Sequence, residues 1–166
     1  MTASDVFRKE LAALLKGNHA HMGFKAVDNF PALHFNTLIP NMPYTFWHLL
    51  EHIRRTQRDI IDFIIRPDYQ EMRWPQDYWP AVDEQATVEI WHTTVIAIQT
   101  DLNTLEAMVE DEKIDLAAEL PYAPGYTYLR EVLLVADHNA YHLGEFAIVR
   151  GILGLWNQDD GNNYEK

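Results

Sequence analysis

The stretch REVLLVADHNAYHLGEFAIVRG, residues 130–151, decides the expected fold. Its apolar residues recur at helical spacing on two faces, which predicts one long helix over about 127–153. A helix that is apolar nearly all round is buried on both sides, so we expect it to pack between other helices or against a second subunit. Two histidines, His138 and His142, stand one turn apart inside this apolar run.

Three further segments have apolar residues at helical spacing. In the last of them the apolar residues alternate steps of four and three, which is typical of the seam of a helix bundle. No strand pattern of comparable strength is present, so the expected fold class is all-α. We predict one four-helix-bundle domain over 1–156 and a polar tail over 157–166. The three segments run from a Ser4-Asp5 cap to Gly17, from a Thr45 cap to about Ile65, and over about 84–111.

Two connections have no clear periodicity. Residues 17–42 are expected to contain a short helix around 24–30, followed by a proline-punctuated loop. Residues 66–83 are dense in proline, tryptophan and tyrosine, and we expect an ordered loop that packs on its own rings. These connections are expected to shape the mouth of any pocket.

The overall charge restricts the partners. Of 166 residues, 25 are acidic and 13 are basic, so the formal net charge is −12. Such a surface repels phosphate groups, which argues against a nucleic acid or an anionic membrane as partner. The N-terminal segment lacks the apolar core of a signal peptide, and no run approaches the roughly 18–20 apolar residues of a membrane span. We therefore expect a cytoplasmic protein.

The histidine spacing predicts a metal site. Two imidazoles at positions i and i+4 of a helix can converge on one ion. A second pair with this spacing occurs in HLLEH, residues 48–52, where His52 lies at the edge of the apolar face and His48 lies about 40° further toward the polar side. We therefore expect His52, His138 and His142 to share one metal, and His48 to lie at the rim or in solvent. Three protein ligands leave an open position, as in catalytic sites. The alternative is buried histidines that only pack and form hydrogen bonds.

Glu145 lies one turn after His142 on the same side of the helix, and it is the expected group for proton transfer or for orienting a ligand. Several other residues have weaker signals. They are Tyr141, Trp47 and Asp59 as possible pocket residues, His19 and His21 as possible residues of the site's mouth, and His34 and His92 as surface or packing residues.

Two motifs resemble the DinB-like superfamily, also called DinB/YfiT-like metalloenzymes. The stretch YTFWHLLEHIRRTQRDI, 44–60, is similar to its W-S-x-x-x-x-L-x-H-L motif, and HNAYHLGEFAIVRGILG, 138–154, is similar to its H-x-x-x-H-x-x-Q motif. WPQDYWP, 74–80, also looks like a feature of one subgroup. The resemblance implies an up-down-down-up four-helix bundle, a homodimer, and a divalent ion, zinc or nickel, on His52, His138 and His142. Glu145 stands where the family usually shows glutamine.

These observations favour a metal-dependent hydrolase, or a transferase that uses a low-molecular-weight thiol, acting on a small molecule. The chain has no cysteine, so such a thiol would come from a cofactor or substrate. The alternative is a non-catalytic metal-binding or dimeric stress-response protein with a vestigial site. A third hypothesis takes HLLEH as the H-x-x-E-H pattern of inverzincin peptidases, with Glu51 as general base. It is disfavoured because those enzymes are much larger and because it leaves HNAYH without a role.

Overall fold

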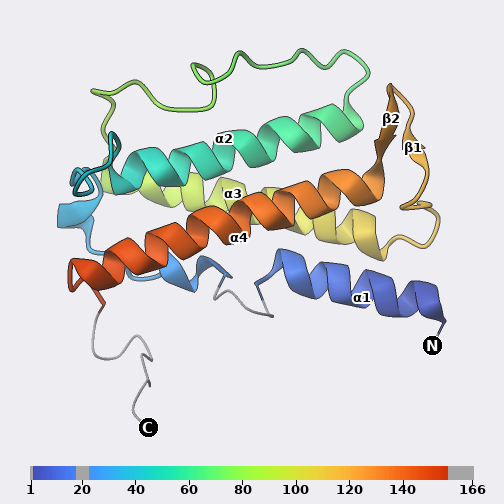
Figure 1. The fold of residues 1–166 in the computed structure, drawn as a ribbon, viewed down its shortest axis with the longest axis horizontal. Coiled ribbons are helices and arrows are strands. Elements are labelled where there is room, and N and C mark those ends of the chain that lie inside the picture. Colours follow the sequence, from blue (N-terminus) through green and yellow to red (C-terminus); the bar gives the residue numbers. More distant parts are fainter. Residues whose placement is uncertain (1, 18–22, 157–166) are drawn as a thin grey trace, which may run out of the picture.

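The computed structural model describes residues 2–17 and 23–156, and these residues are predominantly helical, as predicted. They form four α-helices, two short 3-10 helices and one small antiparallel sheet (Figure 1). The predicted polar tail, 157–166, lies outside the described residues. The elements are α1 Ala3–Leu15, η1 Gly23–Ala26, η2 Ala32–His34, α2 Phe46–Ile65, α3 Val88–Glu110, β1 Glu119–Leu120, β2 Ala123–Thr127 and α4 Tyr128–Ile152.

Threonine caps begin the α-helices. The hydroxyls of Thr45, Thr87 and Thr127 accept the N–H of the third residue of α2, α3 and α4, which satisfies a backbone donor that the helix itself leaves unpaired. The cap predicted at Ser4-Asp5 is wrong. Thr2 caps α1, and the Asp5 carboxylate completes a capping box by accepting the Thr2 N–H at 2.6 Å.

Two further expectations differ from the structure. The third helix begins at Val88 rather than at 84, because the cap is Thr87. The short hairpin of β1 and β2 was not predicted, since β1 has two residues and β2 contains Pro124 and Gly125 in place of alternating apolar residues. This hairpin leads directly into the first turn of α4.

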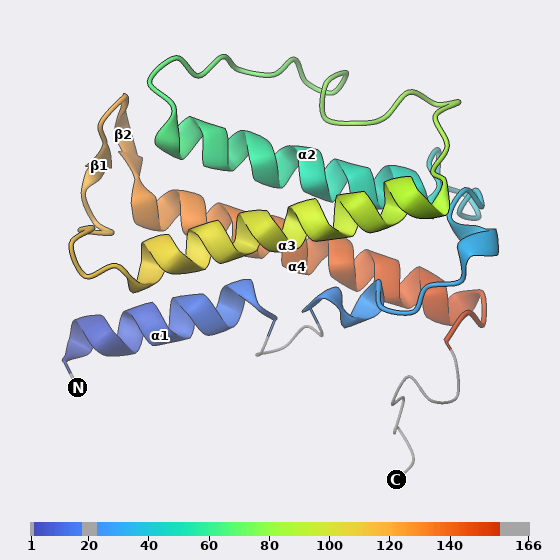
Figure 2. The same ribbon diagram turned by 180° about the vertical axis from the view of Figure 1, so that it is seen from behind.

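The helices lie side by side along the long axis of the molecule. α2 packs against α3 and α4, and α1 packs against the same two helices. Followed through their colours, α1 and α4 run in one direction and α2 and α3 in the other (Figures 1 and 2). α2 and α3 can run in the same direction because the long connection 66–87 returns the chain along the length of α2.

Two groups of buried apolar side chains form the core. One is rich in aromatic rings and includes a close stack of Phe35 on Trp91, whose ring centroids are 3.9 Å apart. The other is aliphatic and lies between α1, α2, α3 and α4. Within the single chain, one side of α4 packs in the core and the other is exposed, so the expected burial of the second side would need a second subunit. The exposed apolar residues of α4 are Leu133, Leu134, Tyr141, Ile148 and Ile152.

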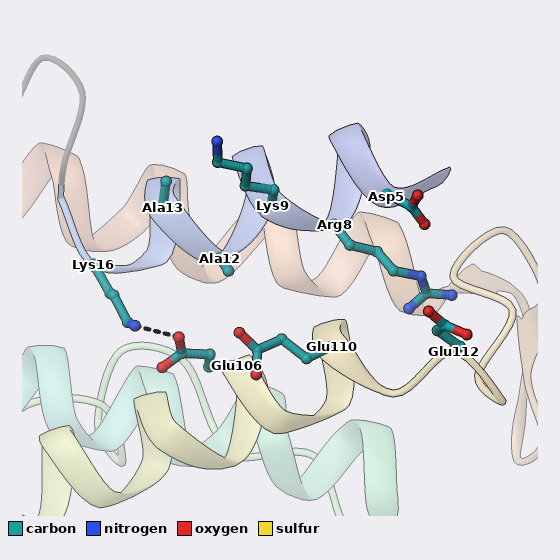
Figure 3. A pocket seen from close by; sticks show the side chains of 9 residues that line it. All are labelled: Asp5, Arg8, Lys9, Ala12, Ala13, Lys16, Glu106, Glu110 and Glu112. Carbon is teal, nitrogen blue, oxygen red and sulfur yellow. Dashed lines mark ion pairs between the residues drawn. The ribbon is translucent and has the colours of Figure 1, made fainter. Parts of the chain in front are cut away.

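Charged groups join α1 to α3. The Arg8 guanidinium donates to the carbonyl oxygens of Val109 and Ile114 at 2.6 Å each, so it caps the C-terminal end of α3. Figure 3 shows Lys16 and Glu106 forming an ion pair across a hollow of about 450 Å³ between the two helices. No histidine lines this hollow. In the described part of the chain, no helix has the length and the apolar character needed to cross a membrane.

A buried pair of amides ties α2, α3 and α4 together. Gln57, which is fully buried on α2, donates to the carbonyl oxygen of Ile98 on α3 at 2.8 Å. Its own amide oxygen accepts from Asn139 on α4, also at 2.8 Å. Asn139 is next to His138, so this pair holds the helices in place close to the histidines.

We predict that Gln57→Leu lowers the free energy of unfolding by about 2–3 kcal/mol, because it removes two buried hydrogen bonds and leaves the Asn139 amide without its acceptor. Urea unfolding followed by circular dichroism measures the change. Gln99→Leu, at an exposed position of α3, is the matched control and should change stability by less than about 0.5 kcal/mol. Equal effects of the two substitutions would contradict the role of Gln57.

Candidate metal site

The structure brings together the three histidines that the sequence singles out. His52 comes from α2, and His138 and His142 come from consecutive turns of α4, which packs against α2. One ring nitrogen of each lies within 4.8 Å of the others, and these three are the group of described residues suited to hold a metal ion. His52 is 2% exposed, and the other two are half-buried.

One pair of these nitrogens has the spacing of metal ligands. The Nε2 atoms of His52 and His138 are 3.2 Å apart. Two nitrogens that bind one tetrahedral ion at 2.0–2.1 Å lie about 3.3–3.4 Å apart. The whole set spans no more than 4.8 Å, so the three rings lie close enough together for one ion to be shared among them.

The connection 66–87 fixes the orientation of His52. The ring stacks on Trp79, with centroids 4.0 Å apart and an interplanar angle of 4°. Its Nδ1 lies 3.0 Å from the carbonyl oxygen of Tyr78, and since a carbonyl only accepts, Nδ1 carries the proton. Nε2 therefore has a free lone pair that faces the other two histidines, which is the tautomer that a metal ligand needs.

A carboxylate fixes His142 in the same way. The Nδ1–H of His142 donates to the Glu145 carboxylate at 3.0 Å, which leaves Nε2 free. The other oxygen of Glu145 accepts a hydrogen bond from the Tyr44 hydroxyl. Burial opposes ionisation of Glu145, but the hydrogen bonds from His142 and Tyr44 outweigh it and hold the pKa of the carboxyl below its usual value. Glu145 thus supports His142 as an ionised base.

His138 lacks such support. Its Nδ1 is buried and has no hydrogen-bond partner among the described residues. A buried, unpaired polar group costs about 1–3 kcal/mol. An ion bound at Nε2 would leave Nδ1 unpaired all the same, so the case for a metal rests on the convergence of the three rings and not on this atom.

Burial keeps the rings neutral. Burial, together with a smaller contribution from the neighbouring histidines, lowers the pKa of His52 to about 4 and that of His138 to about 3. Hydrogen bonding of His52 to the Tyr78 carbonyl opposes the shift without reversing it. At neutral pH both rings are therefore uncharged, which is the form that binds a metal.

Asp59 anchors the connection that carries Tyr78 and Trp79. Its carboxylate accepts hydrogen bonds from the hydroxyls of Tyr69, at 2.9 Å, and Tyr78, at 2.7 Å. Burial and the negative charge of Asp59 raise the pKa of both tyrosines, so the phenols remain donors. Asp59 thus acts on His52 through Tyr78, whose backbone accepts from the imidazole and whose side chain is held by the carboxylate.

His48 and Glu51 point to other partners. The expectation that His48 lies at the rim or in solvent is wrong, because it is 4% exposed. Its Nδ1 accepts from the backbone N–H of Thr45 and its Nε2–H donates to the carbonyl oxygen of Glu84 at 3.0 Å. Glu51 is bound by Arg54 and Arg55. His48 and Glu51 are therefore not placed as the metal ligand and the general base that the inverzincin hypothesis requires.

The remaining sequence candidates lie apart from the three rings or at their edge. Tyr141 is exposed, and its ring centroid is 4.8 Å from that of His142. Trp47 is a buried core residue, His34 lies 3.3 Å from the Thr37 hydroxyl, and His92 is exposed. His19 and His21 lie outside the described residues.

Sequence reasoning missed Tyr44, Tyr78 and Trp79 as parts of the site. All three come from irregular segments, where periodicity carries no information on direction. The aromatic density of 74–80 is the one signal that favoured an ordered loop there. Comparison with known proteins gives no guide to the site: no family model matches the chain, and neither a curated protein nor a solved structure matches it.

We predict that acid destabilises the metal-free protein through the buried rings. The pKa values of His52 and His138 lie below the usual 6.5. Below about pH 6.5 the unfolded chain therefore binds more protons than the folded chain, and protonation favours unfolding. Stability is therefore complete above about pH 6.5 and decreases toward pH 4, by at most about 1.4 kcal/mol per pH unit for each ring.

Urea unfolding at about pH 7 and about pH 5 tests this. His138→Gln should lose measurably less stability between the two conditions than the parent protein, whereas His92→Gln, at an exposed position, should lose the same amount. An unchanged pH dependence in His138→Gln would contradict the buried, neutral ring.

We predict that Glu145→Ala weakens metal binding roughly 10- to 100-fold, because His142 loses the acceptor that orients its ring. Glu145→Gln should have a smaller effect, since the amide oxygen can still accept the Nδ1–H. Competition with a chromophoric chelator gives the affinities, and Glu110→Ala, an exposed carboxylate on α3, is the control. Equal affinities of Glu145→Ala and Glu110→Ala would show that the carboxylate does not support the site.

Proposed function

We propose that the protein is a metal-dependent enzyme in which His52, His138 and His142 hold one divalent ion, zinc or nickel. The observation that carries this proposal is the convergence of three imidazole nitrogens within 4.8 Å. Nitrogen-rich sites suit both metals. We propose further that it acts on a small molecule, as a hydrolase or as a transferase that uses a low-molecular-weight thiol.

The donor set supports this reaction class. A divalent ion on three neutral ligands keeps its full charge and can polarise a carbonyl group or stabilise a thiolate. The chain itself has no cysteine, so the thiol of a transfer reaction would be a co-substrate.

Glu145 is the proposed proton acceptor. It is half-buried and ionised, and Tyr44 and His142 each donate to one of its oxygens. A carboxylate has about four lone-pair positions, so two of them remain for a substrate proton. The hydrogen bonds from Tyr44 and His142 fix the direction of the remaining lone pairs. Tyr44 is held in turn by stacking on Trp79, with ring centroids 5.0 Å apart.

Membership of the DinB-like superfamily is also a proposal. The helix directions described above support an up-down-down-up four-helix bundle, and the two motifs place His52, His138 and His142 at the family's metal positions. The homodimer that the resemblance implies would bury the exposed apolar side of α4, on which Leu134, Tyr141 and Ile148 follow one another at intervals of seven residues.

One observation favours the alternative of a metal-binding protein with a vestigial site. His52 is almost inaccessible, because Trp79 covers the face of its ring. Such cover restricts the approach of a substrate while leaving the ligand nitrogens in place. Metal content and turnover therefore need separate measurements.

Elemental analysis of protein purified without a histidine tag tests the metal. We expect one ion per chain in the parent protein and in His92→Ala, and less than about a tenth of that in His142→Ala, because two nitrogens bind far more weakly than three. Failure of the parent protein to bind any divalent metal would contradict the proposal.

A reaction screen then tests catalysis. The metal-loaded and metal-free proteins are assayed with ester and amide substrates, and with thiols in the presence of electrophilic acceptors. Metal-dependent turnover that is lost in His142→Ala and reduced in Glu145→Ala is expected. Metal binding without any turnover would favour the vestigial site.

A further inference from the structure

A second cavity, of about 330 Å³, lies between α2, α4, β2 and the connection 66–87. Its volume is in the range of sites for small organic molecules. Three tyrosines and a phenylalanine form much of its wall. They are Phe63, Tyr69, Tyr78 and Tyr126.

Three of these rings form one connected group. Phe63 meets both Tyr69 and Tyr126 edge to face, with centroids 5.2 and 5.3 Å apart. The Arg130 guanidinium lies 4.7 Å from the centroid of the Tyr126 ring, so this wall already takes part in one cation–π contact.

The charges in the cavity do not balance. Asp59, Glu71 and Glu131 line it, but Arg130 is its single basic residue. Arg130 pairs with Glu131, which is 1% exposed. The half-buried Asp59 is held by two phenols, and no basic side chain among the described residues forms an ion pair with it. Asp59 also lines a neighbouring hollow with Arg55, Arg58 and Arg66, but these pair with other carboxylates. Asp59 and Glu71 therefore keep a negative charge on the side of the aromatic rings.

We propose that this cavity binds a small organic cation, an ammonium compound whose charged end lies beside Asp59 and the tyrosine rings. A carboxylate and the faces of aromatic rings both attract such an ion, and aromatic rings are a recurring means of binding quaternary ammonium groups. The net charge of −12 raises the local concentration of cations, and the same charge opposes anionic ligands.

The cavity lies one to two helical turns from the three histidines along α4 and α2. Leu134, which lines it, is one helical turn before His138, and Asp59 is seven residues, or about 10 Å, along α2 from His52. Tyr78 belongs to both places, since its hydroxyl binds Asp59 and its carbonyl binds His52. If the proposed function is correct, on which this step rests, an organic ammonium compound is the substrate class of the enzyme, and the cavity holds the charged end of the substrate.

Binding of two matched probes to the metal-free, full-length protein tests the cavity by isothermal titration calorimetry. Choline carries the ammonium group, and 3,3-dimethylbutan-1-ol is its neutral isostere. We expect choline to bind at least about tenfold more tightly than the alcohol. Equal affinities, or no binding of choline at millimolar concentration, would overturn the proposal.

Two variants locate the binding. Asp59→Asn should reduce choline affinity at least about tenfold, whereas Asp83→Asn, an exposed position with the same change in net charge, should not. Tyr126→Leu removes one exposed ring and should weaken binding several-fold without unfolding the chain, which keeps the test decisive if Asp59→Asn fails to fold. Equal choline affinity in Tyr126→Leu and the parent would overturn the proposal.

Metal titration of the same preparations separates this inference from the proposed function. Choline binding by the metal-free protein does not depend on the three histidines, so a protein that binds choline and no metal would disprove only the function. A protein that binds metal and no choline would disprove only the cavity.

Discussion

The packing of α2 against α4 determines the rest of the site. His52 and the pair His138 and His142 belong to different helices, so their nitrogens meet only while these helices keep one relative rotation and one axial position. The buried hydrogen bonds of Gln57 to Ile98 and Asn139 supply such a restraint, because an amide that leaves its partner inside the core stays unsatisfied. Apolar packing alone would tolerate small shifts of the helices more readily.

The connection 66–87 forms a second layer along α2 (Figure 1). It supplies the Trp79 ring and the Tyr78 carbonyl to His52, and it is held in turn by Asp59 on α2. Tyr78 lies between the histidines and the aromatic cavity, and it contacts His52 on one side and Asp59 on the other. A loop built in this way can position a ligand and a metal-binding ring together, which accounts for its density of large rings in a surface segment.

Much of the site could be predicted because the direction in which a helical side chain points follows from its position in the sequence. The i and i+4 spacing of His138 and His142, and the edge position of His52, follow from 100° per residue. The environment of His48 could not be predicted in this way. Its ring forms a capping box with Thr45 and is covered by the backbone of Glu84, which lies in a loop distant in the sequence.

The structure around the C-terminal end of α4 shows the same limit. Arg150 is fully buried and donates to the carbonyl oxygens of Ala26, Asp28 and Leu155. Arginine is ordinarily exposed, and backbone acceptors in irregular segments leave no pattern in a sequence. Tyr44, Tyr78 and Trp79 were missed for the same reason, because contacts from loops depend on the path of the chain rather than on spacing.

Anomalous diffraction from crystals of the tag-free protein grown with zinc locates the metal ion and its ligands. We expect one strong peak per chain, at the 2.0–2.1 Å typical of zinc and imidazole from the Nε2 atoms of His52, His138 and His142. A peak held by other residues, or by only one of the two helices, would contradict the proposed metal site.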